Sequence, residues 1–148
     1  MKRFLCLFLS LILVGSAAVP AAASENAYTY SSKNIPLDNG IIIIEETIEH
    51  SLTRATGKTV TKRGTIKKDD TVLAVIAFQV DFHYDGTTVT VASKSVTQTD
   101  TYNGWNYKQT SFTSSGGTVT LTGKITKLLV LSQSFTLSVT CDKNGNIS

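Results

Sequence analysis

The sequence predicts an all-β protein: an antiparallel β-sandwich, Ig-like or similar, with about six to seven strands. Three observations predict this fold. From residue 41 onward, segments with apolar residues at alternate positions recur at short intervals. Turn-forming dipeptides such as Asp85-Gly86 and Asn103-Gly104 separate these segments. Beyond the first 23 residues, no segment has the 3.6-residue period of an amphipathic helix.

The composition describes one folded domain. The chain has 148 residues, of which 41% are hydrophobic and 17% are charged. This length suits a single domain, and the hydrophobic content is high enough for a core, which excludes a disordered chain. The net charge is +3 and falls to about +1 once a leader carrying Lys2 and Arg3 is removed, so nothing indicates a nucleic-acid partner.

The first 23 residues have the order of a secretory signal peptide. Lys2 and Arg3 precede an apolar run over 4–14, and small residues follow, ending in Ala21 and Ala23. We expect a leader helix over 1–23, cleavage after Ala23 and an extracellular protein. Because the apolar run is too short to span a bilayer, we expect no membrane association after cleavage.

The remaining chain divides into a short lead-in and one sandwich domain. Residues 24–40 are polar and predict a flexible lead-in that adds at most a short strand. The domain over 41–148 opens with four isoleucines, which favour a strand. We expect a bend around Gly57 and a polar turn over 67–70.

The segment over 71–84 is the strongest strand. Its first half, 72–78, is apolar at nearly every position, which predicts a central strand that is covered on both faces. Its second half alternates, with Phe82 and Tyr84 pointing one way and Asp81 and His83 the other. The segments expected to form the following strands are 87–101, 105–113, 119–125 and 135–141.

Cysteine usage excludes an internal disulfide in the mature chain. Cys6 leaves with the leader, so Cys141 has no partner in its own chain. Its place on the apolar side of the last strand predicts burial. We expect a monomer, with a Cys141-linked dimer as the alternative.

Three stretches of the domain resemble a known group of proteins. The run 81–90, the strand that contains Trp105 and the ending 136–148 are similar to an uncharacterised family of small secreted all-β proteins from Gram-positive (Firmicutes) bacteria. The resemblance implies secretion and a β fold, and it brings no catalytic or ligand residues. It also implies that relatives can form a disulfide this chain lacks, because Val91 or Ala92 stands where many members have a second cysteine.

One group of polar residues could carry metal or acid/base chemistry. Asp81, His83 and Asp85 lie at spacing two and therefore share one face of a strand. The simpler interpretation is an exposed polar face that ends in a turn aspartate. Zinc needs three or four convergent ligands, so we expect neither a metal nor another cofactor. Asp142, at the start of a stretch rich in asparagine, predicts a turn in preference to a calcium loop.

Surface aromatic residues are the other candidate site. Tyr102, Trp105 and Tyr107 flank the turn at Asn103, where they could stack on a ligand. The alternative is that Trp105 and Tyr107 belong to the core, as a central tryptophan does in many sandwiches.

These observations favour a secreted non-enzymatic binding or interaction module whose partner is an unknown protein or glycan. The sequence has no G-x-S-x-G or H-E-x-x-H motif and only two histidines, so we do not expect an enzyme. One alternative is a carbohydrate-binding module that uses Tyr102, Trp105 and Tyr107. The other is a small secreted hydrolase that uses Asp81 and His83.

Overall fold

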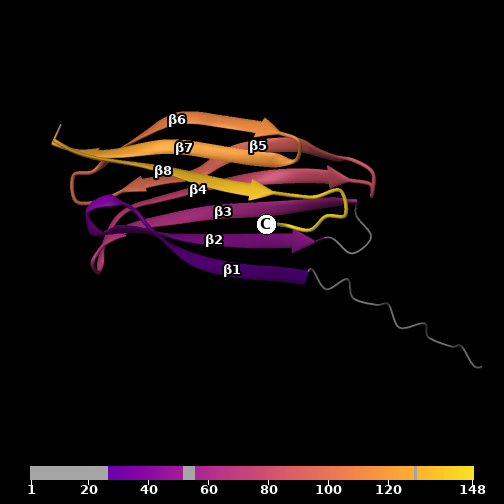
Figure 1. The fold of residues 1–148 in the computed structure, drawn as a ribbon, viewed down its shortest axis with the longest axis horizontal. Helices are drawn as coiled ribbons and strands as arrows, with labels where there is room; N and C mark the ends of the chain where they lie inside the picture. The colour runs from indigo at the N-terminus through magenta and orange to yellow at the C-terminus, as the bar shows by residue number, and fades with distance from the viewer. Residues whose placement is uncertain (1–26, 52–55, 129) are drawn as a thin grey trace, which may run out of the picture.

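The computed structural model describes residues 27–51, 56–128 and 130–148. This part of the chain forms eight strands in two sheets (Figure 1). The predicted leader and its cleavage site lie outside the described residues. The strands are β1 (Ala27–Pro36), β2 (Ile41–Ser51), β3 (Gly57–Lys68), β4 (Thr71–Tyr84), β5 (Val89–Thr101), β6 (Asn106–Ser115), β7 (Thr118–Lys127) and β8 (Leu131–Thr140), with a 3-10 turn η1 (Asp38–Gly40) after β1.

The predicted antiparallel β-sandwich is confirmed, and its connections are simpler than an Ig-like topology. One sheet has the order β1-β2-β3-β4-β5 and the other the order β6-β7-β8, and all pairs are antiparallel. Each sheet is therefore a meander, whereas Ig-like sandwiches are built on Greek-key connections. The turn at Asn103-Gly104 closes no hairpin, because it joins β5 in one sheet to β6 in the other.

The described residues form eight strands, whereas the sequence predicts six to seven. The additional strand is β1, which occupies most of the expected flexible lead-in over 24–40. It pairs with β2 over its whole length, from Ala27 opposite Ser51 to Pro36 opposite Ile42. The sequence of β1 is mostly polar and has no apolar alternation. This segment therefore becomes a strand through its hydrogen-bonded pairing with β2.

The core lies between the two sheets, with β4 at its centre. β4 runs between β3 and β5, and its residues Ile76, Phe78 and Val80 are fully buried against the three-stranded sheet. The expectation that 72–78 is covered on both faces is only half right, because the second sheet lies on one face alone. On the other face, Val75 is half-buried and Ala77 is buried by side chains of the neighbouring strands.

The smaller sheet covers only part of the larger one. β6 lies against β5, β7 against β4 and β8 against β3, so β1 extends beyond the covered area (Figure 1). The inward residues of β2, among them Ile41, Ile43 and Glu45, are buried. On this face Glu45 follows the two isoleucines and forms a buried ion pair with Lys62 of β3. Lys62 Nζ lies 2.9 Å from Glu45 Oε2 and donates to Thr47 Oγ1 at 3.1 Å, and both charged side chains are only 5% exposed.

Candidate functional site

The three aromatic residues predicted to bind a ligand do not form one exposed surface. Tyr102 is exposed, Trp105 is buried and Tyr107 is half-buried. Tyr107 turns inward and packs on Phe135, with ring centroids 6.0 Å apart, across the space that the missing side chain of Gly123 leaves. Burial raises the pKa of the Tyr107 hydroxyl, which has no partner among the described residues. The core interpretation therefore describes Trp105 and Tyr107 better than the ligand platform does.

The polar residues of the β4 end are occupied by structural hydrogen bonds. Asp81 accepts from Thr59 Oγ1 at 2.7 Å and from Ser93 Oγ at 2.5 Å, which ties β4 to both neighbouring strands. Asp85 caps the β4–β5 turn by accepting hydrogen bonds from the backbone N–H groups of Thr87 and Thr88. These bonds hold the pKa of its carboxyl below the ordinary value. His83 is exposed and lies 3.4 Å from Thr56 Oγ1 through Nδ1. Within the described ranges, no group of three or more His, Cys, Asp or Glu residues could hold a metal ion.

The last strand and the chain end behave as the sequence predicts. Cys141 is buried, with 1% of its surface exposed, and burial raises the pKa of its thiol. Asp142 accepts from the backbone N–H groups of Asn144 and Asn146, so this stretch is a capped turn. The Asn146 side chain also donates to this carboxylate, which lowers the pKa of Asp142.

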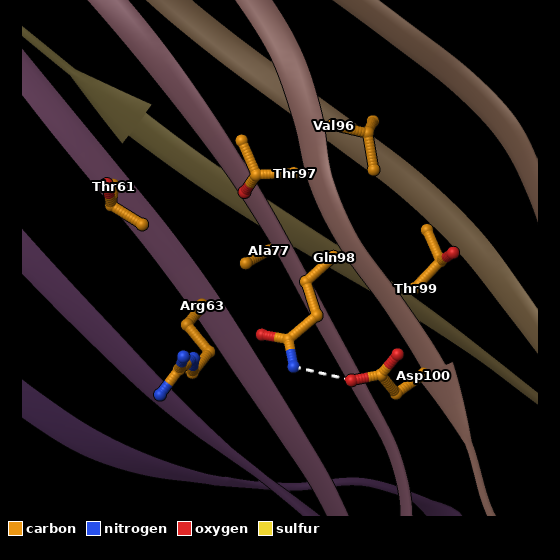
Figure 2. A pocket seen from close by; sticks show the side chains of 8 residues that line it. All are labelled: Thr61, Arg63, Ala77, Val96, Thr97, Gln98, Thr99 and Asp100. Carbon is orange, nitrogen blue, oxygen red and sulfur yellow. Dashed lines mark hydrogen bonds between the residues drawn. The ribbon is translucent and has the colours of Figure 1, made fainter.

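An open hollow lies on the outer face of the five-stranded sheet (Figure 2). It has a volume of about 690 Å³ and is open to solvent along the sheet. Figure 2 shows Arg63 and Gln98 on opposite sides of Ala77, with Asp100 beyond Gln98. The residues that line it are Thr61, Arg63, Ala77, Val96, Thr97, Gln98, Thr99 and Asp100. We call this feature the outer hollow.

Local sequence explains why the sheet is hollowed here. Ala77 pairs with Arg63 on β3 and with Gln98 on β5, so one methyl group stands between two long side chains in the same cross-strand row. The β4–β5 register then shifts, because Phe78 pairs with Val96 and Thr97 has no partner. A bulge of this kind bends the strand and redirects neighbouring side chains. The small residue and the bulge together form the floor and one wall of the outer hollow.

Hydrogen-bonding groups of several kinds border the outer hollow. Gln98 Nε2 donates to Asp100 Oδ2 at 2.6 Å, which leaves the amide oxygen of Gln98 free to accept from a ligand. Arg63 Nη1 lies 3.9 Å from Glu46 Oε2, and Arg63 Nε has no hydrogen-bond partner among the described residues. The outer hollow thus presents a guanidinium, an amide, a carboxylate and hydroxyl groups on one open surface.

Two exposed tyrosines on β1 extend this surface. Tyr28 is 65% and Tyr30 60% exposed. Tyr30 donates to Glu46 Oε1 at 2.7 Å, and this bond raises the pKa of the Tyr30 hydroxyl. Glu46 pairs with Arg63 in the β2–β3 ladder, so the hydrogen bond from Tyr30 to Glu46 connects this tyrosine to the border of the outer hollow. Sequence reasoning missed these tyrosines, although their spacing of two in the lead-in was a signal for one face of a strand.

Comparison with protein-family models, with curated protein sequences and with solved structures found no match. The resemblance to small secreted proteins of Gram-positive bacteria stays a prediction. Within the described residues, no helix is long and apolar enough to cross a membrane.

Proposed function

We propose that this chain is a secreted, non-catalytic binding module that holds a glycan in the outer hollow. The observation that carries the proposal is the outer hollow itself, about 690 Å³ on the outer face of the five-stranded sheet. A site built on strands holds its side chains in fixed positions, which favours recognition of a ligand with a defined shape. The open form suits a ligand that lies along the sheet and extends beyond it at both ends.

The chemistry of the lining supports a hydroxyl-rich ligand. Sugar hydroxyl groups both donate and accept, and they need donors and acceptors on the same surface. Arg63 supplies donors, Asp100 supplies acceptors and Gln98 supplies both kinds. A surface built for an anionic ligand would carry an excess of positive charge, whereas Arg63 and Asp100 balance each other in the lining.

The exposed tyrosines supply the complementary apolar contact. Pyranose rings have a face of C–H groups that packs well on an aromatic ring, and tyrosine adds a hydroxyl at its edge. Tyr30 is linked through Glu46 to Arg63 and so to the outer hollow. These residues take the role that the sequence assigned to Tyr102, Trp105 and Tyr107.

The same lining favours binding over hydrolysis. Most glycosidases use two carboxyl groups on opposite sides of the scissile bond. In the lining of the outer hollow, Asp100 is the one carboxylate, and Gln98 already donates to it. Glu46, the next acidic side chain in the row, is held by Tyr30 and lies near Arg63.

A glycan array with the leader-free protein tests the proposal, followed by titration calorimetry on any ligand found. The decisive variant is Ala77→Leu, which fills the floor of the outer hollow without touching the inner core. Ala92→Leu is the matched control, because Ala92 is exposed on the same β5 edge and lies outside the lining. We expect binding to fall at least tenfold in Ala77→Leu and to stay unchanged in Ala92→Leu.

Single-group variants then identify the hydrogen-bonding role. Gln98→Ala and Arg63→Ala should each weaken binding by about tenfold, since each leaves ligand hydroxyls without a partner. Tyr30→Ala should have a smaller effect. A glycan array that stays silent at high protein concentration overturns the glycan proposal. Equal loss in Ala77→Leu and Ala92→Leu places the site elsewhere on the sheet.

A further inference from the structure

The β7–β8 turn exposes apolar side chains that the fold does not use. Leu128 is 78%, Val130 83% and Leu131 54% exposed. Leu128 and Val130 are the most exposed large hydrophobic side chains in the described part of the chain. We call Leu128, Val130 and Leu131 the apolar tip. Figure 1 shows this turn projecting beyond the other turns at its end of the sandwich, at the left of the view.

The backbone of the turn argues against a purely structural role for its leucine. Leu128 has φ +51, in the left-handed region that favours glycine and asparagine. The other described non-glycine residues with positive φ are Asn39, Asp69 and Asn103, which are types that tolerate this conformation. Glycine or asparagine would therefore serve folding better at position 128. A strained, exposed leucine indicates that its side chain is used for a contact outside the fold.

The surroundings of the apolar tip combine apolar floor residues with lysines. A depression of about 280 Å³ lies beside it, and Leu131 lines this depression together with Leu73 and Trp105. Lys68 and Lys127 also line it, against the single carboxylate of Asp69. The exposed Tyr102 stands in the neighbouring turn, next to the lining residue Asn103. The lining of this depression therefore carries two lysines against one carboxylate, and an exposed tyrosine lies beside it.

We propose that the apolar tip docks the protein on the surface of a lipid bilayer that contains anionic lipid. Leucine and valine would enter the boundary between headgroups and acyl chains, while the lysines contact anionic headgroups. Tyrosine is enriched at this depth because one end of its ring is apolar and the other is polar. A stable protein partner would need about 1,000 Å² of buried surface, more than three side chains on a narrow turn provide. This inference departs from the expectation of no membrane contact and is independent of the glycan proposal, which concerns another surface.

The single tryptophan of the chain is a built-in reporter for this contact. Trp105 is the only tryptophan, and it lines the same depression as Leu131. Docking through the apolar tip would bring Trp105 close to the acyl chains. The experiment measures quenching of Trp105 fluorescence in the leader-free protein by vesicles of brominated phosphatidylcholine, with and without brominated phosphatidylglycerol. We expect quenching that grows with the anionic fraction and weakens when salt is added.

Variants separate the apolar and the charged contributions. Leu128→Asn removes an apolar side chain and suits the positive φ, so it should raise thermal stability and still weaken vesicle binding. Val130→Ser with Leu131→Ser should lower the partition coefficient about tenfold or more, because several buried methylene groups are lost. Lys68→Gln with Lys127→Gln should lower binding to anionic vesicles by about fivefold for each lysine. Tyr28→Ser with Tyr30→Ser is the matched control, since it removes exposed apolar surface from another face.

Three results would overturn the proposal. The first is that anionic vesicles do not quench Trp105 at any lipid concentration. The second is that Leu128→Asn and Val130→Ser with Leu131→Ser partition as the unmodified protein does. The third is self-association of the unmodified protein that the apolar-tip variants abolish, without vesicle binding, which would assign the apolar tip to contact with a second copy of the chain.

Discussion

The two faces of the five-stranded sheet use the same strands for different purposes. The inward face of β4 carries Ile76 and Phe78, both fully buried in the core. The outward face of the same strand carries Ala77 at the floor of the outer hollow. The inward face of β2 carries Glu45, which forms a buried ion pair with Lys62. The outward face carries Glu46, which contacts Tyr30 and Arg63 near the surface. Adjacent residues of one strand can therefore differ widely in what their replacement costs.

The largest difference is expected between apolar residues on the two faces of β4. Phe78→Ala should lower the free energy of unfolding by about 3–5 kcal/mol, because it removes a buried ring and leaves a cavity. Val75→Ala, on the half-buried outer face, should cost about 1 kcal/mol. Urea denaturation of both variants checks this. Similar losses at the two positions would mean that another layer covers the outer face.

The two glutamates of β2 give the second comparison. Glu45→Ala should cost about 3–5 kcal/mol, because it leaves Lys62 as an unpaired charge with only 5% of its side chain exposed. Glu46→Ala should cost less than about 1 kcal/mol, since its ion pair with Arg63 is long and partly exposed. The double variant Glu45→Met with Lys62→Met should recover most of the loss. Chemical denaturation that gives equal losses for the two single variants would contradict this assignment of faces.

A smaller difference is expected within the polar end of β4. The sequence alone predicts that Asp81→Ala and His83→Ala both stay within about 0.5 kcal/mol. The structure changes the first value, because Asp81 holds Thr59 and Ser93 across two strand pairs. Asp81→Ala should cost about 1–2 kcal/mol, while His83→Ala stays within about 0.5 kcal/mol. Thermal denaturation ranks the two, and a larger loss at His83 would show that it has a partner that the fold does not reveal.

The smallest expected effect is a decrease in the free energy of unfolding at low pH. The hydrogen bonds made by the turn caps Asp85 and Asp142 depress their pKa values below the ordinary 3.8 in the folded protein. Their contribution to stability is therefore complete above that value and is lost as the pH falls through the lower, folded-state pKa values. The free energy of unfolding, measured by urea titration from pH 5 to pH 2, should decrease toward acid. Asp142→Asn should reduce this slope, because the amide can still accept from the turn N–H groups but does not titrate.

Sequence reasoning predicted the fold better than the candidate site. The alternation over 78–84 and 119–125, together with the turn dipeptides, was enough for an antiparallel sandwich, and the apolar run over 72–78 was enough to place β4 in the core. The burial of Cys141 followed from the same alternation. The sequence left open whether Trp105 and Tyr107 are core or surface residues, because alternation shows which residues share a face and not which face is buried.

The sequence by itself determined the local features, since strand period and turn chemistry depend on neighbours along the chain. What only the tertiary structure decided are the relations between distant strands. The polar β1 becomes a strand because β2 offers an edge to it, and Glu45 becomes buried because Lys62 stands on the adjacent strand. The outer hollow arises because Ala77 pairs with Arg63 and Gln98, each more than a dozen residues away. The register between strands sets these pairs, and that register depends on how the whole sheet buries its inward face.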